Sequence, residues 1–292
     1  MPDTTPTASN GSGNIATTPN TSATGATIAP TTASGSGSAA ISTVTPITTP
    51  TFADGFIRTN STLNNSGSMI ANGQTEVVVQ QGLKNAGQID VHELDVKGAA
   101  FTNQNGSIIT DNTHIQTNRL NNQNGSITTR QQLAIQTAQL DNAHGQLLSA
   151  EKANLAVSGS LNNTQRGDIQ AKQLNINAAD VDNAGNMIGE HDSHLTTQKS
   201  LRNSGSIAVQ ELSSKGQVLD NTQGQITVDK ANIQTAYINN QNGNITTAEQ
   251  LTIYSQKIDN QNGKLLSVKN AQLTVSGSLN NPLAQAWQPL YL

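Results

Sequence analysis

The chain has 292 residues, enough for one or two compact domains, with 12% charged and 2% aromatic residues and a formal net charge of −4. A net charge this small does not indicate a nucleic-acid-binding surface. The absence of cysteine excludes a disulfide framework and thiol chemistry. No apolar run approaches the ~18 residues of a membrane span. The first residues also lack the basic and apolar regions of a signal peptide.

Residues 1–50 consist almost entirely of Thr, Ser, Ala, Gly and Pro, with Asp3 as the only charged side chain. Such a segment buries too little apolar surface to offset its ordering entropy, so a disordered linker is predicted there. Residues 51–62 are predicted to be a lead-in or an N-terminal cap. No proline lies between Thr51 and Asn281, which favours an uninterrupted hydrogen-bonded ladder.

Residues 63–281 consist of units of 18 to 21 residues, which predicts a stack of similar structural units. The spacings recur in the same order after 118 residues, so 63–180 and 181–281 form two duplicated blocks. The units begin at Leu63, Leu83, Phe101, Leu120, Leu140, Leu161, Val181, Leu201, Leu219, Ile238, Ile258 and Leu279.

An asparagine occupies the third position of every unit. These residues are Asn65, Asn85, Asn103, Asn122, Asn142, Asn163, Asn183, Asn203, Asn221, Asn240, Asn260 and Asn281. In all units but the last, a glycine follows and an apolar residue stands two positions beyond it, as in Gly125 and Ile127. A second, alternating apolar pair comes later, such as Leu133 and Ile135. This alternation, broken by Asn/Gly turns, is typical of short strands.

Hairpins are the usual interpretation of Asn-Gly turns, but they leave the equal unit lengths unexplained. A parallel β-helix explains them, because each unit then makes one turn with its apolar residues stacked inside. In this interpretation the glycine takes a corner with positive φ, and the asparagine also tolerates such a corner. The asparagine amides bond from turn to turn as a structural ladder. Turns roughly 4.8 Å apart give a rod about 50 Å long.

These units resemble the haemagglutinin repeats of filamentous haemagglutinin and HecA-like adhesins, with the pattern Leu-x-Asn-x-x-Gly-x-Ile followed by Leu-x-Ile. The resemblance covers 63–281. It implies an all-β fold, a right-handed parallel β-helix, in a protein exported by a two-partner system to the cell surface. Some members of the family are contact-dependent inhibition proteins that carry a toxin. The sequence shows neither a secretion domain before the repeats nor a toxin-sized module after them.

The sequence offers few candidate sites. His191 and His194 lie three residues apart and would point to opposite faces of a strand, so they are a poor metal pair. Asp141, Asp182, Asp220 and Asp259 hold the second position of their units and could line a Ca²⁺ site, although other units carry uncharged or basic residues there. Surface solvation explains them better. We therefore expect no catalytic, cofactor or metal site.

The sequence is thus interpreted as a rod segment of a secreted, surface-displayed adhesin, not an enzyme. Its expected partners are a receptor or glycan on another cell and an outer-membrane transporter during export. One alternative is a non-binding stalk of a contact-dependent inhibition protein. A second is a pectate-lyase-like polysaccharide-active β-helix, which the nearly constant unit length disfavours. Residues 282–292 leave the pattern and are either an apolar cap or junction sequence.

Overall fold

The computed structural model describes residues 15–16, 55–71 and 75–282, and every regular element in these ranges is a β-strand. The proposed linker over 1–50, apart from residues 15–16, and the tail from 283 onward lie outside the described residues. The strands are β1 (Ile15–Ala16), β2 (Gly55–Thr59), β3 (Leu63–Asn65), β4 (Ser68–Ile70), β5 (Thr75–Val79), β6 (Gly82–Asn85), β7 (Gln88–Asp90), β8 (Glu93–Thr102), β9 (Ser107–Asn121), β10 (Ser126–Asp141), β11 (Gln146–Asn163), β12 (Asp168–Asn183), β13 (Asn186–Gly189), β14 (His194–Asn203), β15 (Ser206–Asp220), β16 (Gln225–Asn239), β17 (Asn244–Asp259), β18 (Lys264–Ser267) and β19 (Asn270–Asn280).

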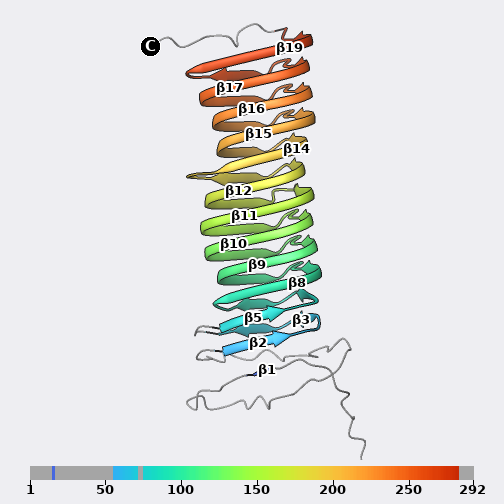
Figure 1. The fold of residues 1–292 in the computed structure, drawn as a ribbon, viewed down its shortest axis with the longest axis vertical. Helices are drawn as coiled ribbons and strands as arrows, with labels where there is room; N and C mark the ends of the chain where they lie inside the picture. Colours follow the sequence, from blue (N-terminus) through green and yellow to red (C-terminus); the bar gives the residue numbers. More distant parts are fainter. Residues whose placement is uncertain (1–14, 17–54, 72–74, 283–292) are drawn as a thin grey trace, which may run out of the picture.

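The strands wind into one continuous coil with about twenty residues per turn, and we call each turn a rung (Figure 1). Neighbouring rungs pair in parallel: Ile127 of β10 is opposite Ile108 of β9 on one side and Leu147 of β11 on the other. The predicted parallel β-helix is therefore confirmed. Within the described residues the only antiparallel pairing joins β1 to β2, and β2 itself pairs in parallel with β5. The coil thus begins within the segment 51–62.

Each rung has three faces, and β10 with its flanking residues shows them. The first face runs through Ser126–Thr129, the second through Gln132–Thr137 and the third through Gln139–Asp141, with pairing interrupted between them at the corners. Rungs differ by one or two residues, and the register shifts that absorb these differences lie at the corners between faces. The faces therefore stay in register along the rod although the unit length varies.

The core is a set of aliphatic columns that run along the axis. The apolar residue after each glycine, the alternating pair and the first residue of each unit all point inward, as predicted from their spacing. Ile127, Leu133 and Leu140 show how completely they are buried, with exposed fractions of 0 to 1%. Burial of one such side chain contributes roughly 1.5 to 3 kcal/mol. A single rung holds too few of them to fold alone, so stability comes from stacking.

The structure and the sequence prediction disagree on which residue of the turn adopts a positive φ. The recurrent glycines do not have it. In the turns with two or three residues between asparagine and glycine it falls instead on the residue before the glycine, at 52° for Asn124 and 55° for Asn242. The prediction for the glycines was therefore wrong. Nor does any ladder asparagine take such a corner. Glycine is required for a different reason: a Cβ at Gly125 would lie 2.0 Å from the backbone carbonyl oxygen of Asn103 on the adjacent rung.

The last described rung is less buried than the interior ones. Leu273 and Val275 of β19 are only partly buried, and Leu279 is 47% exposed. Val268, in the turn before β19, is 49% exposed. Among the described strands β19 pairs only with β17, so one edge of its backbone has no described strand beside it. The aliphatic columns thus reach the end of the described coil without interruption.

Candidate functional site

The twelve asparagines stack in one column in the interior of the rod, beside the Asn/Gly turns. Asn122 Nδ2 donates to Asn142 Oδ1 at 2.8 Å, and its own Oδ1 accepts from Asn103 Nδ2 at 2.8 Å. The same bond joins every consecutive pair from Asn65 to Asn281, at 2.6 to 3.1 Å.

The side-chain amide of each interior asparagine also donates a hydrogen bond to a backbone carbonyl of its own turn. Asn122 Nδ2 donates to the carbonyl oxygen of Gly125 at 3.2 Å and to that of Gln146 at 2.9 Å. The side chain is fully buried, so this network satisfies a polar group that would otherwise be costly inside the core. The asparagine column is therefore a structural element of the turns and offers no group to a ligand.

The second position of many units also has a structural use. The side-chain oxygen of Asp141 accepts the backbone N–H of Ala143 at 3.1 Å, and Asp220 accepts that of Thr222 at 3.1 Å. Asn162 makes the same contact with Thr164. These are Asx turns, which explains why Asn or Asp occupies this position in most units. Among the described residues no group of three or more His, Asp or Glu side chains is placed to hold a metal ion.

His191 and His194, the two histidines considered as a metal pair, have different surroundings. The backbone carbonyl of His191 accepts the hydroxyl of Ser193 at 2.8 Å. His194 instead places Nδ1 3.3 Å from Glu211 Oε2 on the next rung. No third ligand of the described chain joins them.

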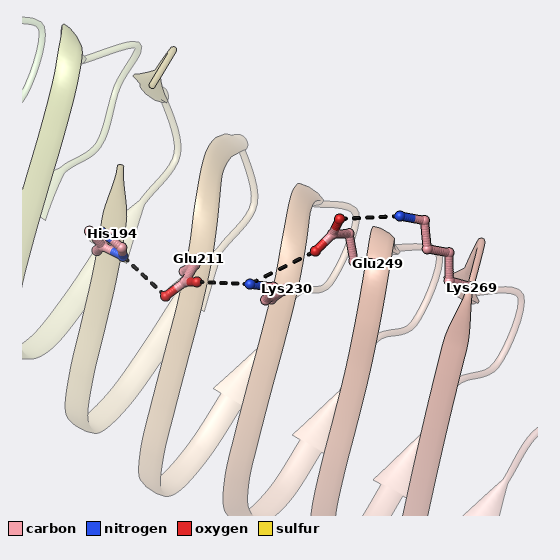
Figure 2. A network of polar contacts seen from close by, with 5 residues as sticks. All are labelled: His194, Glu211, Lys230, Glu249 and Lys269. Carbon is pink, nitrogen blue, oxygen red and sulfur yellow. Dashed lines mark hydrogen bonds and ion pairs between the residues drawn. The ribbon is translucent and has the colours of Figure 1, made fainter. Parts of the chain in front are cut away.

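Charged side chains of alternating sign follow the corner between the first and second faces. Figure 2 shows the longest run, in which each member lies one rung from the next. Lys230 Nζ is 3.4 Å from Glu211 and 3.8 Å from Glu249, and Lys269 Nζ is 3.2 Å from Glu249. We call the run from His194 to Lys269 the charged column. All of its side chains are about half exposed, so each pair contributes at most about 1 kcal/mol.

The first block carries a shorter arrangement at the same corner. Asp111 lies 2.8 Å from both His92 Nδ1 and Arg130 Nη1. The hydrogen bond from Arg130 is the main reason why the pKa of Asp111 is lowered, against a smaller opposing effect of burial. Further along, Lys172 pairs with Glu151 at 3.2 Å. The corner is thus a place for charge pairing between rungs in both blocks.

A groove lies along the opposite corner, between the second and third faces. It spans the rungs from Lys97 to Gln198 and encloses about 680 Å³. Its floor includes Ala138, Val157 and Ala179, and we call it the corner groove. No sequence motif predicted this groove. The signal was available in the small corner residues, but their alignment depends on register shifts between rungs.

A smaller hollow of about 370 Å³ lies at the turns of two short units. Gly185 and Gly205 belong to turns with one residue between asparagine and glycine, whereas Arg166 lies in a turn with three. Residues of the longer turn and of the shorter ones thus line the same hollow. Arg166 has a φ of 67° and an exposed side chain.

The comparison with protein families decides what kind of chain this is. Matches to the haemagglutinin repeat family cover residues 32–118, 92–170, 153–228 and 219–281. The chain belongs to the haemagglutinin repeat family. The resemblance predicted from the asparagine and glycine spacing is thereby confirmed. No curated protein and no solved structure matches the chain. Across the described ranges of this haemagglutinin-repeat chain, no helix is long and apolar enough to cross a membrane.

Proposed function

We propose that this haemagglutinin-repeat rod belongs to a secreted bacterial adhesin and carries its binding surface away from the cell that makes it. The supporting observation is the uninterrupted coil, in which the same inward columns continue from β2 to β19. A stack of this kind extends in one dimension and presents long, regular side faces. Such faces suit a protein that must reach another surface and contact it repeatedly.

The proposal includes the absence of enzymatic activity. A catalytic site on a β-helix needs polar side chains brought together above the regular faces, usually by a long loop. The units here vary only from 18 to 21 residues. The two hollows are lined mainly by amides, hydroxyls and small side chains, with a single lysine in one and a single arginine in the other. Neither lining contains a pair of carboxylates for acid–base chemistry.

The partners belong to the same proposal. Contact with a receptor or glycan on another cell would use the exposed faces, and an outer-membrane transporter of a two-partner system would export the chain. Display at the cell surface follows from that route. A coil that propagates rung by rung is compatible with export as an extended chain, because each rung contacts only its neighbours.

Beads coated with the full chain test the adhesive role. We expect them to attach to erythrocytes or epithelial cells more than beads coated with the same chain denatured in urea, measured by flow cytometry. Attachment no better than that of the denatured control would contradict adhesion by the repeats and favour the stalk of a contact-dependent inhibition protein. Release of unsaturated product from polygalacturonate would contradict the non-enzymatic part of the proposal.

A further inference from the structure

The corner groove is built from a row of outward side chains and a row of small corner residues. Lys97, Gln116, Gln136, Ala156 and Asn177 are cross-rung partners and therefore form one straight row along the rod. The neighbouring corner positions in the lining are Asn118, Ala138, Ser158 and Ala179, and the small side chains of the last three leave the space open, as does Gly98 at the end of the second face. The groove thus follows the axis across successive rungs, each roughly 4.8 Å from the next.

The amides in this row are available to a ligand. Of the described residues, none forms a hydrogen bond with the side chains of Gln116 and Gln136. Asn177 Oδ1 accepts Gln198 Nε2 at 3.1 Å, which leaves the other donors of both groups pointing to solvent. The threonines beside the row turn inward instead: Thr137 Oγ1 donates to the carbonyl of Gln139 at 3.1 Å.

The second block shows that the groove is a property of particular side chains. The residues 118 positions after Gln136, Ala138 and Ala156 are Tyr254, Gln256 and Thr274. Tyr254 and Thr274 are cross-rung partners, as Gln136 and Ala156 are. The backbone is therefore the same, while the side chains at this corner are larger. The coil tolerates both versions, so an open groove is not a requirement of the fold.

From this geometry we propose that the corner groove binds an extended, uncharged polysaccharide that lies along the rod. Sugar hydroxyls both donate and accept hydrogen bonds, as do the free amides of the row. Of the alanines in the lining, Ala138 is partly exposed and Ala156 is exposed, so these two methyl groups offer small apolar contacts to the C–H faces of the sugar rings. This inference rests on the proposed adhesive function and assigns a ligand class to one face.

Other ligands fit the groove less well. Lys97 is the only charged residue of the lining, so neither nucleic acid nor an acidic polysaccharide finds the positive charge that it needs. An extended peptide binds a sheet by pairing with a free edge, but the strands of this row are paired on both sides. The lining contains no aromatic ring, so each sugar binds weakly and affinity grows with the number of rungs that the chain contacts.

Affinity electrophoresis of the full chain tests the proposal, with hydroxyethyl cellulose, xyloglucan and galactomannan as neutral probes and heparin and polygalacturonate as acidic ones. We expect at least one neutral probe to retard the chain. The double variant Ala138→Gln/Ala156→Thr, which gives the groove the side chains of the second block, should bind that probe about tenfold more weakly. Gln116→Ala/Gln136→Ala should weaken it comparably, because the amides are lost while the space is kept.

Ala134→Gln is the matched control, because it adds the same side chain to the same strand outside the groove and should leave retardation unchanged. Far-ultraviolet circular dichroism and thermal unfolding should be the same for all variants. The proposal is overturned if no neutral probe retards the folded wild-type chain, if only the acidic probes do, or if Ala138→Gln/Ala156→Thr is retarded as strongly as the wild type.

The test of polysaccharide binding and the test of attachment to cells can fail independently of each other. Loss of polysaccharide binding with intact attachment of the coated beads to cells overturns this inference alone. Retardation by a neutral probe without attachment to cells overturns the adhesive proposal alone. Where both hold, competition by the soluble probe shows that the groove mediates attachment to the cells, whereas attachment that resists competition overturns the groove's part in adhesion.

Discussion

The two duplicated blocks have the same interior and different surfaces. Ile127 and Leu133 of the first block correspond to Ile245 and Leu251 of the second, and all four are buried. Most side chains of the charged column have no such counterparts: Glu93 corresponds to Glu211, but the residue 118 positions before Lys230 is Asn112. After duplication the columns that hold the coil together stayed, whereas the outward columns diverged. Function is therefore to be sought in the positions where the blocks differ.

The largest loss of stability is expected at a position that is the same in both blocks. Asn122→Leu removes one donor and one acceptor from the buried column, so that Asn142 Oδ1 loses its donor and Asn103 Nδ2 loses one of its acceptors. We expect a loss of about 4 kcal/mol in the free energy of unfolding, since each unsatisfied buried group costs roughly 1–3 kcal/mol. Urea denaturation followed by circular dichroism measures it.

Asn240→Leu is the equivalent change in the second block and should cost the same within ~1 kcal/mol. Asn118→Leu is the surface control, since that side chain is exposed, and it should have almost no effect. A difference of several kcal/mol between the two ladder variants would show that the blocks are not equivalent inside.

A smaller loss is expected at the turn glycines. In Gly125→Ala the new methyl group would meet the carbonyl oxygen of Asn103, and the rungs must move apart locally. We expect about 2 kcal/mol of destabilisation by overpacking, again from urea denaturation. Gly243→Ala, with a predicted Cβ position 2.0 Å from the carbonyl oxygen of Asn221, should match it. Wild-type stability for either variant would contradict the close-approach explanation.

The charged column should contribute less than 1 kcal/mol per residue. Glu211→Gln breaks contacts to His194 and Lys230, both about half exposed. We expect a loss of about 0.5 kcal/mol at low salt that disappears at 1 M salt. Glu93, its equivalent in the first block, has no ion pair among the described residues, so Glu93→Gln should be neutral. Equal losses of stability in Glu211→Gln and Glu93→Gln would show that the two blocks do not differ at this position.

The smallest effect concerns pH. Because Arg130 lowers the pKa of Asp111 below its usual value of 3.8, ionised Asp111 stabilises the folded chain above that pH. This contribution is lost as the pH falls below 3.8 through the lower folded pKa. In Arg130→Ala, which copies Ala248 of the second block, the titration midpoint of Asp111 should rise toward 3.8, as followed by NMR. An unchanged midpoint would show that Arg130 is not the cause.

Most of the fold could be predicted because its determinants recur within each unit. The apolar residue stands two positions after the glycine and the asparagine a few positions before it, as Ile127 and Asn122 do around Gly125, and the repetition along the chain makes the pattern unambiguous. The conformation of the turn was not predictable in this way. Asn124 takes the positive φ, while Gly125 is needed because a carbonyl from another rung lies against it. That contact joins residues 22 positions apart, so no single unit reveals it.

The surface columns were missed for a related reason. Glu211 and Lys230 are 19 residues apart and Lys230 and Glu249 another 19, yet Lys230 is opposite Gln250 in the strand pairing. The charged contact depends on a register shift at the corner. The corner groove likewise combines residues whose spacing varies from rung to rung. Sequence spacing identifies the inside of this rod, whereas its outside depends on where each irregularity is placed.

The asparagine column has a direction, because in every interior contact the earlier residue donates and the later one accepts. When the chain emerges from its N-terminal side, each completed rung therefore presents an unfilled amide donor, and the next rung supplies the oxygen. The order in which residues become available is also the order in which the bonds close. The column acts as a one-way template that fixes the alignment of each arriving turn on the turn before it.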